Sequence, residues 1–235
     1  WSYGINMDIL GCVVEVISKM TFDEYLQKNI FDPLNLNSIG FTVKKKDSKS
    51  FTTLYTSGAY SRDGELVAAS GLNRSELMFS KELRAIDSFD NSPYLTESSN
   101  LYDGGSGLVS NIDDYSRFAE MLLNGGVLEG VRILSKASVD LMTRNHLADE
   151  ILKEGAAFGL NGIGFGLTVG VVIDSGLAGS YSSDNEFSWG GAASTIFWVD
   201  RKNNITATMM TQYMPSDRYP LREELKTLLY SKLSN

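Results

Sequence analysis

The stretch Phe187-Ser188-Trp189-Gly190-Gly191-Ala192-Ala193-Ser194-Thr195-Ile196-Phe197-Trp198-Val199 decides the fold of this chain. It is rich in β-branched and aromatic residues, a composition that is typical of a strand in a sheet. Two runs of similar composition stand on either side of it, at Phe165 to Ile173 and Ile205 to Thr211. The polar residues Asp200 to Asn204 supply a hairpin turn between the last two runs. The three runs therefore predict an antiparallel meander.

A closing helix is expected after the sheet. Pro220 suits the start of a helix, because the N–H that proline lacks has no partner in the first turn. The apolar residues that follow recur at helical spacing, and we expect their stripe to lie on the sheet. They are Leu221, Leu225, Leu228, Leu229 and Leu233.

The beginning of the chain is predicted to be helical. From Asp8 to Lys19 the apolar residues recur at helical spacing and predict an amphipathic helix that faces a core. These residues are Ile9, Leu10, Val13, Val14 and Ile17. Thr21 and Glu24 then form a capping-box pattern, which opens a helix that continues through Ile30 and ends before Pro33.

Two more helices are predicted before the strands. Ser110-Asn111-Ile112-Asp113 has the composition of a helix start, and Asn124-Gly125-Gly126 stops that helix. Its apolar face consists of Ile112, Tyr115, Phe118, Ala119, Leu122 and Leu123. A short helix is expected over Ser135 to Thr143, with Val139, Leu141 and Met142 directed inward.

The order of these elements indicates an α/β (α+β) fold in one domain. Residues 41–100 form a loop-rich excursion with short strands, in which Lys44-Lys45-Lys46 is expected to be a solvated turn. We expect a helical and loop-rich part over about residues 1–158, and antiparallel strands with a C-terminal helix over 159–235. No internal repeat and no linker separates the two parts.

Composition excludes several classes of partner. The chain has 29 acidic and 21 basic residues and no stripe of Lys and Arg, which argues against a nucleic-acid partner. No apolar run approaches the roughly 20 residues that span a bilayer. Cys12 is the one cysteine, and its apolar helical surroundings predict a buried structural thiol. With His146 as the one histidine, no zinc cluster is expected.

Two segments at opposite ends of the chain carry candidate chemistry. A serine acyl-transfer site needs a nucleophile, a base that takes its proton, and two N–H groups that stabilise the oxyanion. Tyr3 lies just before the first predicted helix, and Trp189-Gly190-Gly191-Ala192 lies between a polar loop and a strand. Either segment alone is unspecific, because the chain has 11 tyrosines and a glycine pair in a strand is often a bulge.

The order of several segments resembles the superfamily of serine β-lactamases, penicillin-binding proteins and family VIII carboxylesterases. The segments are Tyr3 with Asp8-Ile9-Leu10-Gly11, Phe31-Asp32-Pro33-Leu34-Asn35-Leu36, Gly104-Gly105-Ser106-Gly107-Leu108-Val109-Ser110, Asp114-Tyr115-Ser116-Arg117-Phe118 and Trp189-Gly190-Gly191. Within that superfamily, the class C β-lactamase-related carboxylesterases are the most similar. The resemblance implies a β-lactamase/DD-peptidase-like fold, in which helices flank an antiparallel sheet and a helical subdomain adjoins it.

The resemblance also implies a role for each candidate residue. Tyr3 matches the tyrosine that acts as general base and then as acid for the leaving group. The backbone N–H of Ala192 matches the second oxyanion donor. Ile5, Trp189, Gly190 and Gly191 match substrate-binding positions. No metal or organic cofactor is implied.

Two departures from the family pattern bear on the substrate. Ile5 stands where an asparagine is usual, and an isoleucine has no amide group for hydrogen bonding to a β-lactam or peptide. Trp189 replaces the lysine that attracts a substrate carboxylate, which adds a flat apolar wall in place of a cation. Both changes favour esters over β-lactams.

Three other patterns are interpreted as structural. Ser183-Asp184-Asn185 spells a motif of class A β-lactamases, but it falls where the fold would place a turn. Ser106 lies in a loop before a helix, without the pattern of a nucleophile elbow. His146 follows a helix and is expected at the surface rather than in a catalytic triad.

The motif that carries the nucleophile is absent from these residues. In Ser-x-x-Lys, one helical turn supplies the serine and its activating lysine, and no lysine of this chain has a serine three residues before it. The chain also begins at Trp1, already within a helix-entry motif. We therefore expect the C-terminal part of a larger domain, whose missing N-terminal part supplies strands, serine and lysine, in the same polypeptide or in a separate chain.

The expected function follows from the resemblance. The complete protein is predicted to hydrolyse a small-molecule ester through a serine acyl-enzyme, and this polypeptide alone is expected to be inactive. The alternatives are a β-lactamase or D-Ala-D-Ala carboxypeptidase acting on a β-lactam-like substrate, and a homologue that only binds. The residues do not indicate a compartment.

Overall fold

The computed structural model describes residues 3–43, 45–56, 83–87, 92, 94, 102–153, 161–216 and 219–233. Trp1, Ser2 and Lys44, and most of the loop-rich excursion predicted over residues 41–100, lie outside the described residues. The described part of that excursion contains the 3-10 helix η2 (Lys45–Ser50) and strands β1 (Leu54–Thr56) and β2 (Arg84–Asp87). β1 pairs antiparallel with β2 and parallel with β10 (Tyr213–Met214).

The predicted antiparallel meander is confirmed as a five-stranded sheet in which each strand pairs with the next along the chain. The strands are β5 (Ile163–Phe165), β6 (Gly170–Val172), β7 (Phe187–Gly190), β8 (Ile196–Asp200) and β9 (Ile205–Met209). Two of the predicted strands are corrected, because each is a hairpin of two strands. Composition is the same on both sides of these turns, so it does not reveal where the chain reverses.

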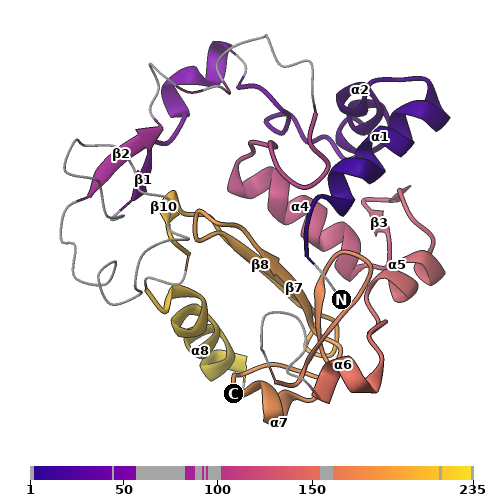
Figure 1. The fold of residues 1–235 in the computed structure, drawn as a ribbon, viewed down its shortest axis with the longest axis vertical. Helices are drawn as coiled ribbons and strands as arrows, with labels where there is room; N and C mark the ends of the chain where they lie inside the picture. The colour runs from indigo at the N-terminus through magenta and orange to yellow at the C-terminus, as the bar shows by residue number, and fades with distance from the viewer. Residues whose placement is uncertain are drawn as a thin grey trace.

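The two faces of this sheet are chemically different. Side chains of a strand alternate between faces, and Phe187, Trp189, Phe197 and Val199 belong to the apolar cluster that contains α4 (Ile112–Leu123). Trp198 and Asp200 point to the other face, toward α8 (Leu221–Leu233), as does Glu186, which directly precedes β7. Figure 1 shows the sheet between α4 and α8.

α4 forms and ends as the sequence predicts. The Asn111 side chain caps its start by accepting a hydrogen bond from the Asp114 N–H at 2.8 Å. Ala119, Met121 and Leu122 are buried against the sheet, and the ring centroids of Tyr115 and Phe197 lie 5.4 Å apart. The predicted Gly stop is confirmed by Gly126, whose φ of +91° favours glycine and whose Cβ would lie 2.2 Å from the Leu134 carbonyl oxygen.

The first helices form as expected, but the prediction that the apolar face of α1 packs on a core was wrong. α1 (Asn6–Ser18) is followed by α2 (Phe22–Leu26) and the π-helical turn η1 (Gln27–Phe31). The Thr21 N–H donates to Glu24 Oε2 at 3.2 Å, which confirms that Glu24 reaches back to the start of α2. Gly11 on α1 is buried against Gly104 and Phe22.

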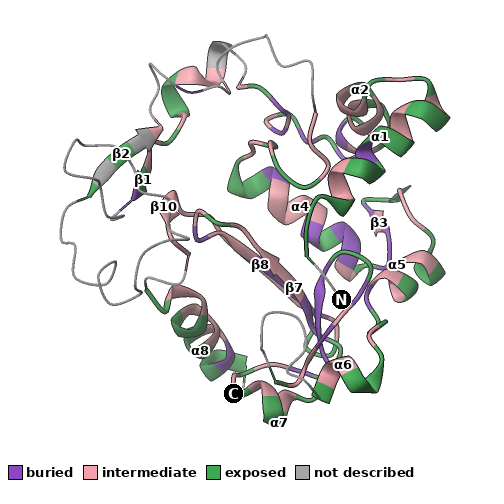
Figure 2. Ribbon diagram, in the orientation of Figure 1, coloured by how far each residue is buried: buried purple, intermediate pink, exposed green. Residues whose placement is uncertain are grey.

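The apolar stripe of α1 points to solvent in the described structure, not to a core. Figure 2 shows α1 largely exposed, and five apolar side chains on one face are between 42% and 79% exposed. They are Ile9, Leu10, Val13, Val16 and Ile17. Cys12 is exposed as well, so the prediction of a buried thiol was wrong. Helical periodicity identifies an apolar stripe, but not what covers it.

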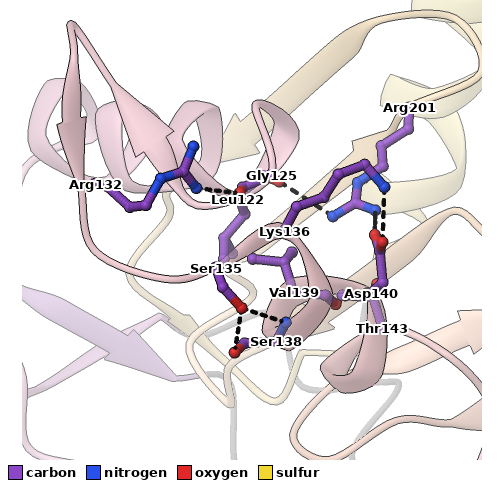
Figure 3. A network of polar contacts seen from close by, with 10 residues as sticks. All are labelled: Leu122, Gly125, Arg132, Ser135, Lys136, Ser138, Val139, Asp140, Thr143 and Arg201. Atoms are coloured by element: carbon purple, nitrogen blue, oxygen red, sulfur yellow. Dashed lines mark hydrogen bonds and ion pairs between the residues drawn. The ribbon is translucent and has the colours of Figure 1, made fainter.

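The polar network of Figure 3 attaches α5 (Lys136–Met142) to the end of β8. Arg201 donates to Asp140 at 2.7 Å and to the Leu122 carbonyl at 3.4 Å. The helix predicted over Ser135 to Thr143 is confirmed, and the Ser135 side chain caps it by accepting from the Ser138 N–H at 3.0 Å. Val139 is buried as predicted, whereas Leu141 is 43% exposed and not directed inward.

The remaining elements are short. They are β3 (Val127–Leu128), β4 (Val131–Arg132), α6 (Asp149–Lys153) and α7 (Ser175–Ala178). Pro220 precedes α8 as expected, but Leu228 and Leu233 on that helix are 67% and 42% exposed, so only part of its leucine stripe is covered. Across the described residues, no helix has the length and apolar character that a bilayer crossing requires.

Candidate active site

Tyr3 and Trp189 lie together, although 186 positions separate them in the sequence. Their ring centroids are 5.7 Å apart at an interplanar angle of 40°. Trp189 is half-buried on β7 and meets the ring of Phe165 on β5 edge-on, with centroids 5.4 Å apart. The indole of Trp189 therefore contacts the ring of Phe165 and the ring of Tyr3. The exposed fraction of Tyr3 is 57%, which leaves much of its side chain open to solvent.

The loop Gly104-Gly105-Ser106-Gly107 fixes the start of α1, three residues after Tyr3. Asp8 Oδ1 accepts a hydrogen bond from the Gly105 N–H at 2.8 Å. A Cβ on Gly104 would lie 2.0 Å from the Met7 carbonyl oxygen, so only glycine allows this approach. The Ser106 hydroxyl donates to Asp103 at 3.2 Å, a contact within the loop. This arrangement fits the structural interpretation of the glycine-rich segment.

Ala192 lies in the turn that joins β7 to β8. The Gly191 N–H donates to the Thr195 carbonyl at 3.0 Å, and the Ser194 N–H donates to the Gly191 carbonyl at 3.2 Å. These bonds close the turn around Ala192, which is exposed. Within the described part of the chain, no group accepts a hydrogen bond from the Ala192 N–H. That donor is available to a ligand.

Both glycines of the turn are required by packing inside the protein. A Cβ on Gly190 would lie 2.7 Å from a guanidinium nitrogen of Arg222, and a Cβ on Gly191 would lie 2.4 Å from Thr195 Oγ1. Sequence reasoning assigned Gly190 and Gly191 to substrate binding and missed Arg222. No local pattern marks Arg222, because its contacts with the turn cross 27 and 31 positions.

Ile5 stands at the N-cap position of α1, where its carbonyl accepts from the Ile9 N–H at 3.1 Å. Its side chain is 69% exposed. The structure thus brings Tyr3 and Trp189 into ring contact, and it places Ile5 two residues from Tyr3 without joining it to the β7–β8 turn.

The other polar patterns are structural in the described residues. Asp184 Oδ1 accepts from the Ser175 N–H at 2.9 Å, and this hydrogen bond lowers the pKa of the Asp184 carboxyl. Ser183 is buried and Asn185 has a φ of +68°, which confirms a turn there. His146 is exposed, and its Nε2 lies 2.8 Å from the Leu141 carbonyl, which confirms a surface histidine.

The described residues form no second centre of chemistry beside this site. Over the described ranges, no three His, Cys, Asp or Glu side chains gather as metal ligands would. A polar hollow does exist beside α5, and its arginine Arg201 is already paired with Asp140. It is lined by Asp140, Thr143, Arg144, Asp184, Asn185, Arg201 and Lys202, none of which belongs to the predicted site.

Comparison with known proteins places this geometry in a family context. The model of the family described as Beta-lactamase matches residues 1–230. Protein Rv1367c of Mycobacterium tuberculosis is 29% identical over 220 residues, which cover 91% of this chain and 49% of that protein. The lovastatin esterase of Penicillium rubens is 26% identical over 220 residues, covering 87% of this chain and 48% of the esterase. The chain spans about half the length of these curated relatives.

A solved structure confirms the fold. The LovD6 mutant of simvastatin synthase from Aspergillus terreus superposes with a TM-score of 0.73, covering 100% of this chain and 55% of the synthase. Sequence identity is 20%, so this likeness concerns the fold alone. Mixed helices and an antiparallel sheet in this arrangement confirm the predicted β-lactamase/DD-peptidase-like fold.

Proposed function

Since this chain belongs to the beta-lactamase family, we propose that it supplies the base and one oxyanion donor of a serine hydrolase that acts on carboxylic esters. The single observation that carries the proposal is the contact between the rings of Tyr3 and Trp189, 5.7 Å apart. It joins a phenol that can exchange a proton to an apolar wall on the strand that leads to Ala192. A general base and an acyl-binding wall are two of the parts that ester hydrolysis needs.

The reaction assigns one step to each of these groups. Tyr3 enters the reaction as a phenolate, stabilised by the lysine of Ser-x-x-Lys. The serine oxygen attacks the ester carbonyl carbon while the phenolate oxygen takes the serine proton, and the tetrahedral oxyanion accepts a hydrogen bond from the Ala192 N–H. The carbon–oxygen bond to the alcohol then breaks, and Tyr3 returns the proton to the departing alkoxide. In the second half Tyr3 takes a proton from water, the hydroxide attacks the acyl-enzyme, and the proton returns to serine as the acid leaves.

The nucleophile comes from outside these 235 residues in this proposal. No lysine of the chain has a serine three residues before it, so the chain lacks Ser-x-x-Lys. The exposed apolar face of α1, which follows Tyr3, is a suitable surface for the segment that carries this motif. The 235-residue chain alone would then form no acyl-enzyme.

Esters are favoured over β-lactams by the two residues beside the base. Trp189 offers no positive charge to a substrate carboxylate, and exposed Ile5 offers no amide group. The lovastatin esterase supports the same choice, since its name describes an ester substrate. A β-lactamase or D-Ala-D-Ala carboxypeptidase activity is the second candidate, and a purely binding role is the third.

Two measurements on one longer polypeptide test the proposal. The polypeptide contains this chain and an upstream Ser-x-x-Lys, and the matched control is its Ser→Ala variant at that motif. We expect fluorophosphonate labelling of the first and not of the second, with faster turnover of a short-chain aryl ester than of a chromogenic cephalosporin. Preferential cephalosporin turnover would replace the esterase by a β-lactamase, and absence of both labelling and turnover would favour a binding role.

A further inference from the structure

We propose that Arg222 is a positioning residue that sets the direction and the donor strength of the Ala192 N–H. The inference rests on the proposed function, in which this N–H stabilises the oxyanion. Arg222 lies in the first turn of α8, on the opposite face of the sheet from the cluster that contains Trp189. It therefore acts through the turn and does not touch the reacting atoms.

The guanidinium holds both ends of the turn. Arg222 Nη2 donates to the Gly191 carbonyl at 2.9 Å and to the Thr195 carbonyl at 2.8 Å. These two carbonyls also accept the N–H groups that close the turn, those of Ser194 and Gly191. A single charged group thus bridges the residues just before and just after the three turn residues. Hydrogen bonds from a charged donor are about twice as strong as neutral ones, so Arg222 restrains both ends of the turn strongly.

A second set of bonds fixes the middle of the turn. The Thr211 hydroxyl donates to the Ala193 carbonyl at 2.7 Å, and the Ser194 hydroxyl donates to the Tyr213 carbonyl at 2.8 Å. The neighbours of Ala192 are therefore restrained on both sides. The Ala192 N–H itself is left available, as described above.

The peptide bond between Gly191 and Ala192 links the arginine to the oxyanion. The Gly191 carbonyl and the Ala192 N–H belong to the same planar trans unit, so they point in opposite directions. Holding the carbonyl toward Arg222 aims the N–H away from the arginine, toward the opposite side of the turn. The positive charge on the carbonyl side also polarises the unit, which makes the N–H a stronger donor.

The absence of a side chain at Gly190 leaves the space that the Arg222 guanidinium occupies. A Cβ there would lie 2.7 Å from Nη2 and 2.8 Å from Cζ, which is too close for both groups to keep their places. The small residue at this position, assigned from the sequence to substrate binding, is thus explained by the arginine behind the strand. Gly190 and Arg222 should therefore act as one unit.

A double-mutant cycle in the longer, Ser-x-x-Lys-containing polypeptide tests this unit. We expect Arg222→Met to lower kcat for a short-chain aryl ester at least tenfold with KM changed less than threefold, because the N–H acts on the transition state. Gly190→Ala should lower kcat similarly by displacing the guanidinium. The double variant should be no slower than Arg222→Met alone. If the losses of kcat multiply in the double variant, or if Arg222→Met is as active as the parent, the inference is overturned.

The matched control is Arg132→Met. Arg132, which Figure 3 draws beside α5, also donates to two backbone carbonyls, those of Gly125 and Leu134, at 3.3 and 2.9 Å. Loss of these bonds should leave kcat unchanged. If Arg132→Met lowers kcat as much as Arg222→Met does, a general loss of stability explains both variants and the inference fails.

An amide measurement separates this inference from the proposed function. With 15N-alanine labelling, Arg222→Met should shift the Ala192 N–H resonance upfield by weakening its polarisation, while the amide resonance of Ala119, buried on α4, stays in place. A polypeptide that shows this shift but hydrolyses no ester would refute the esterase and leave the positioning role standing. An Ala192 resonance that does not respond to Arg222→Met would refute the positioning role, whatever the activity.

Discussion

Two properties of Tyr3, the packing of its ring and the proton transfer by its hydroxyl, can be separated by removing the hydroxyl oxygen. Its ring packs on Trp189 at 5.7 Å, and its hydroxyl is the group that the proposed reaction uses. The ring contact depends on the aromatic face and not on the hydroxyl. Packing and proton transfer can therefore be tested independently at this one residue.

Tyr3→Phe should remove the activity and keep the fold. The phenyl ring can keep the contact with Trp189, so the free energy of unfolding should change by less than about 0.5 kcal/mol. Loss of the general base should lower kcat/KM for an aryl ester in the longer polypeptide by about 10²- to 10⁴-fold. Tyr181→Phe is the control, because Tyr181 is also exposed, at 60%. A Tyr3→Phe variant with more than a tenth of the parent activity would exclude Tyr3 as the base.

At the scale of elements, α8 is joined to the sheet by a polar cluster in which Tyr230 and Lys226 contact two buried acids. The Tyr230 hydroxyl oxygen lies 2.6 Å from Glu186 Oε2 and 2.7 Å from Asp200 Oδ2, and Lys226 contacts Glu186 Oε1. Glu186 and Asp200 are 1% and 0% exposed. A hydroxyl has one hydrogen, so it can donate to one of the two carboxyls. The other carboxyl then receives no proton from Tyr230.

The environments of the two acids indicate which one accepts the hydrogen bond from Tyr230. Burial raises the pKa of the Glu186 carboxyl, against the opposing effects of Lys226 and Tyr230. Burial acts on Asp200 in the same direction, but hydrogen bonds from Tyr230, Asn203 and Ser183 outweigh it and lower the pKa of the Asp200 carboxyl. We infer that Tyr230 donates to ionised Asp200, and that Glu186 takes up a proton at a higher pH than a free glutamate does.

The two acids should give stability profiles of opposite sign against pH. Above the unfolded pKa of glutamate, about 4.3, the unfolded chain releases a proton that folded Glu186 keeps, so stability falls with rising pH until the folded pKa is passed. The slope can reach about 1.4 kcal/mol per pH unit, and Glu186→Gln should lack it. Asp200 stabilises above the unfolded pKa of aspartate, about 3.9, and this stability is lost as pH falls through its lowered folded pKa, a loss that Asp200→Asn should not show.

Urea unfolding between pH 3 and 8, followed by tryptophan fluorescence, measures both profiles. The difference in stability between Glu186→Gln and the parent should move in favour of the variant as the pH rises above about 4.3. A constant difference over the whole range would show that Glu186 titrates alike in the folded and unfolded chains, and the raised pKa of Glu186 would then be wrong.

Element by element, the sequence predicts what local rules control. Asn111 and Ser135 mark their helix starts correctly, because a cap bonds to a backbone N–H three residues away. The order of strands also follows from the sequence. The hairpin turns inside two runs were missed, since Gly191 to Thr195 contains none of the Pro, Asn and Asp residues that mark many turns.

The candidate site was predictable only in part, for the same reason. Tyr3 and Trp189 were paired through the order of family-like segments, and the structure brings their rings together. Arg222 could not be found, because its partners are backbone carbonyls, which leave no trace in the residue types around them. The exposure of α1 was missed because an apolar stripe is the same whether or not something covers it.

At the scale of the whole molecule, α1 shows that the described fold leaves an apolar surface open. Gly11 is buried against Gly104 and Phe22, while Val16 and Ile17 on the opposite face of α1 are 79% and 77% exposed. A cluster of large apolar residues in water is typical of a surface that another segment covers. The chain also spans about half the length of its curated relatives, at 49% and 48%. In our proposal the segment with Ser-x-x-Lys covers this face.

Ile17→Gln should therefore have different effects in the two polypeptides. In the 235-residue chain Ile17 is exposed and glutamine is a good helix former, so the free energy of unfolding should change by less than about 0.5 kcal/mol. In the longer polypeptide the same change should cost about 2 kcal/mol, because an isoleucine side chain loses its burial there.

Leu228→Gln is the control, since Leu228 is 67% exposed on α8, and its effect should be small in both. Denaturant unfolding gives these values, and Cys12 should react more slowly with a thiol reagent in the longer polypeptide. Equal effects of Ile17→Gln in both polypeptides would show that α1 stays uncovered and that the nucleophile segment packs elsewhere.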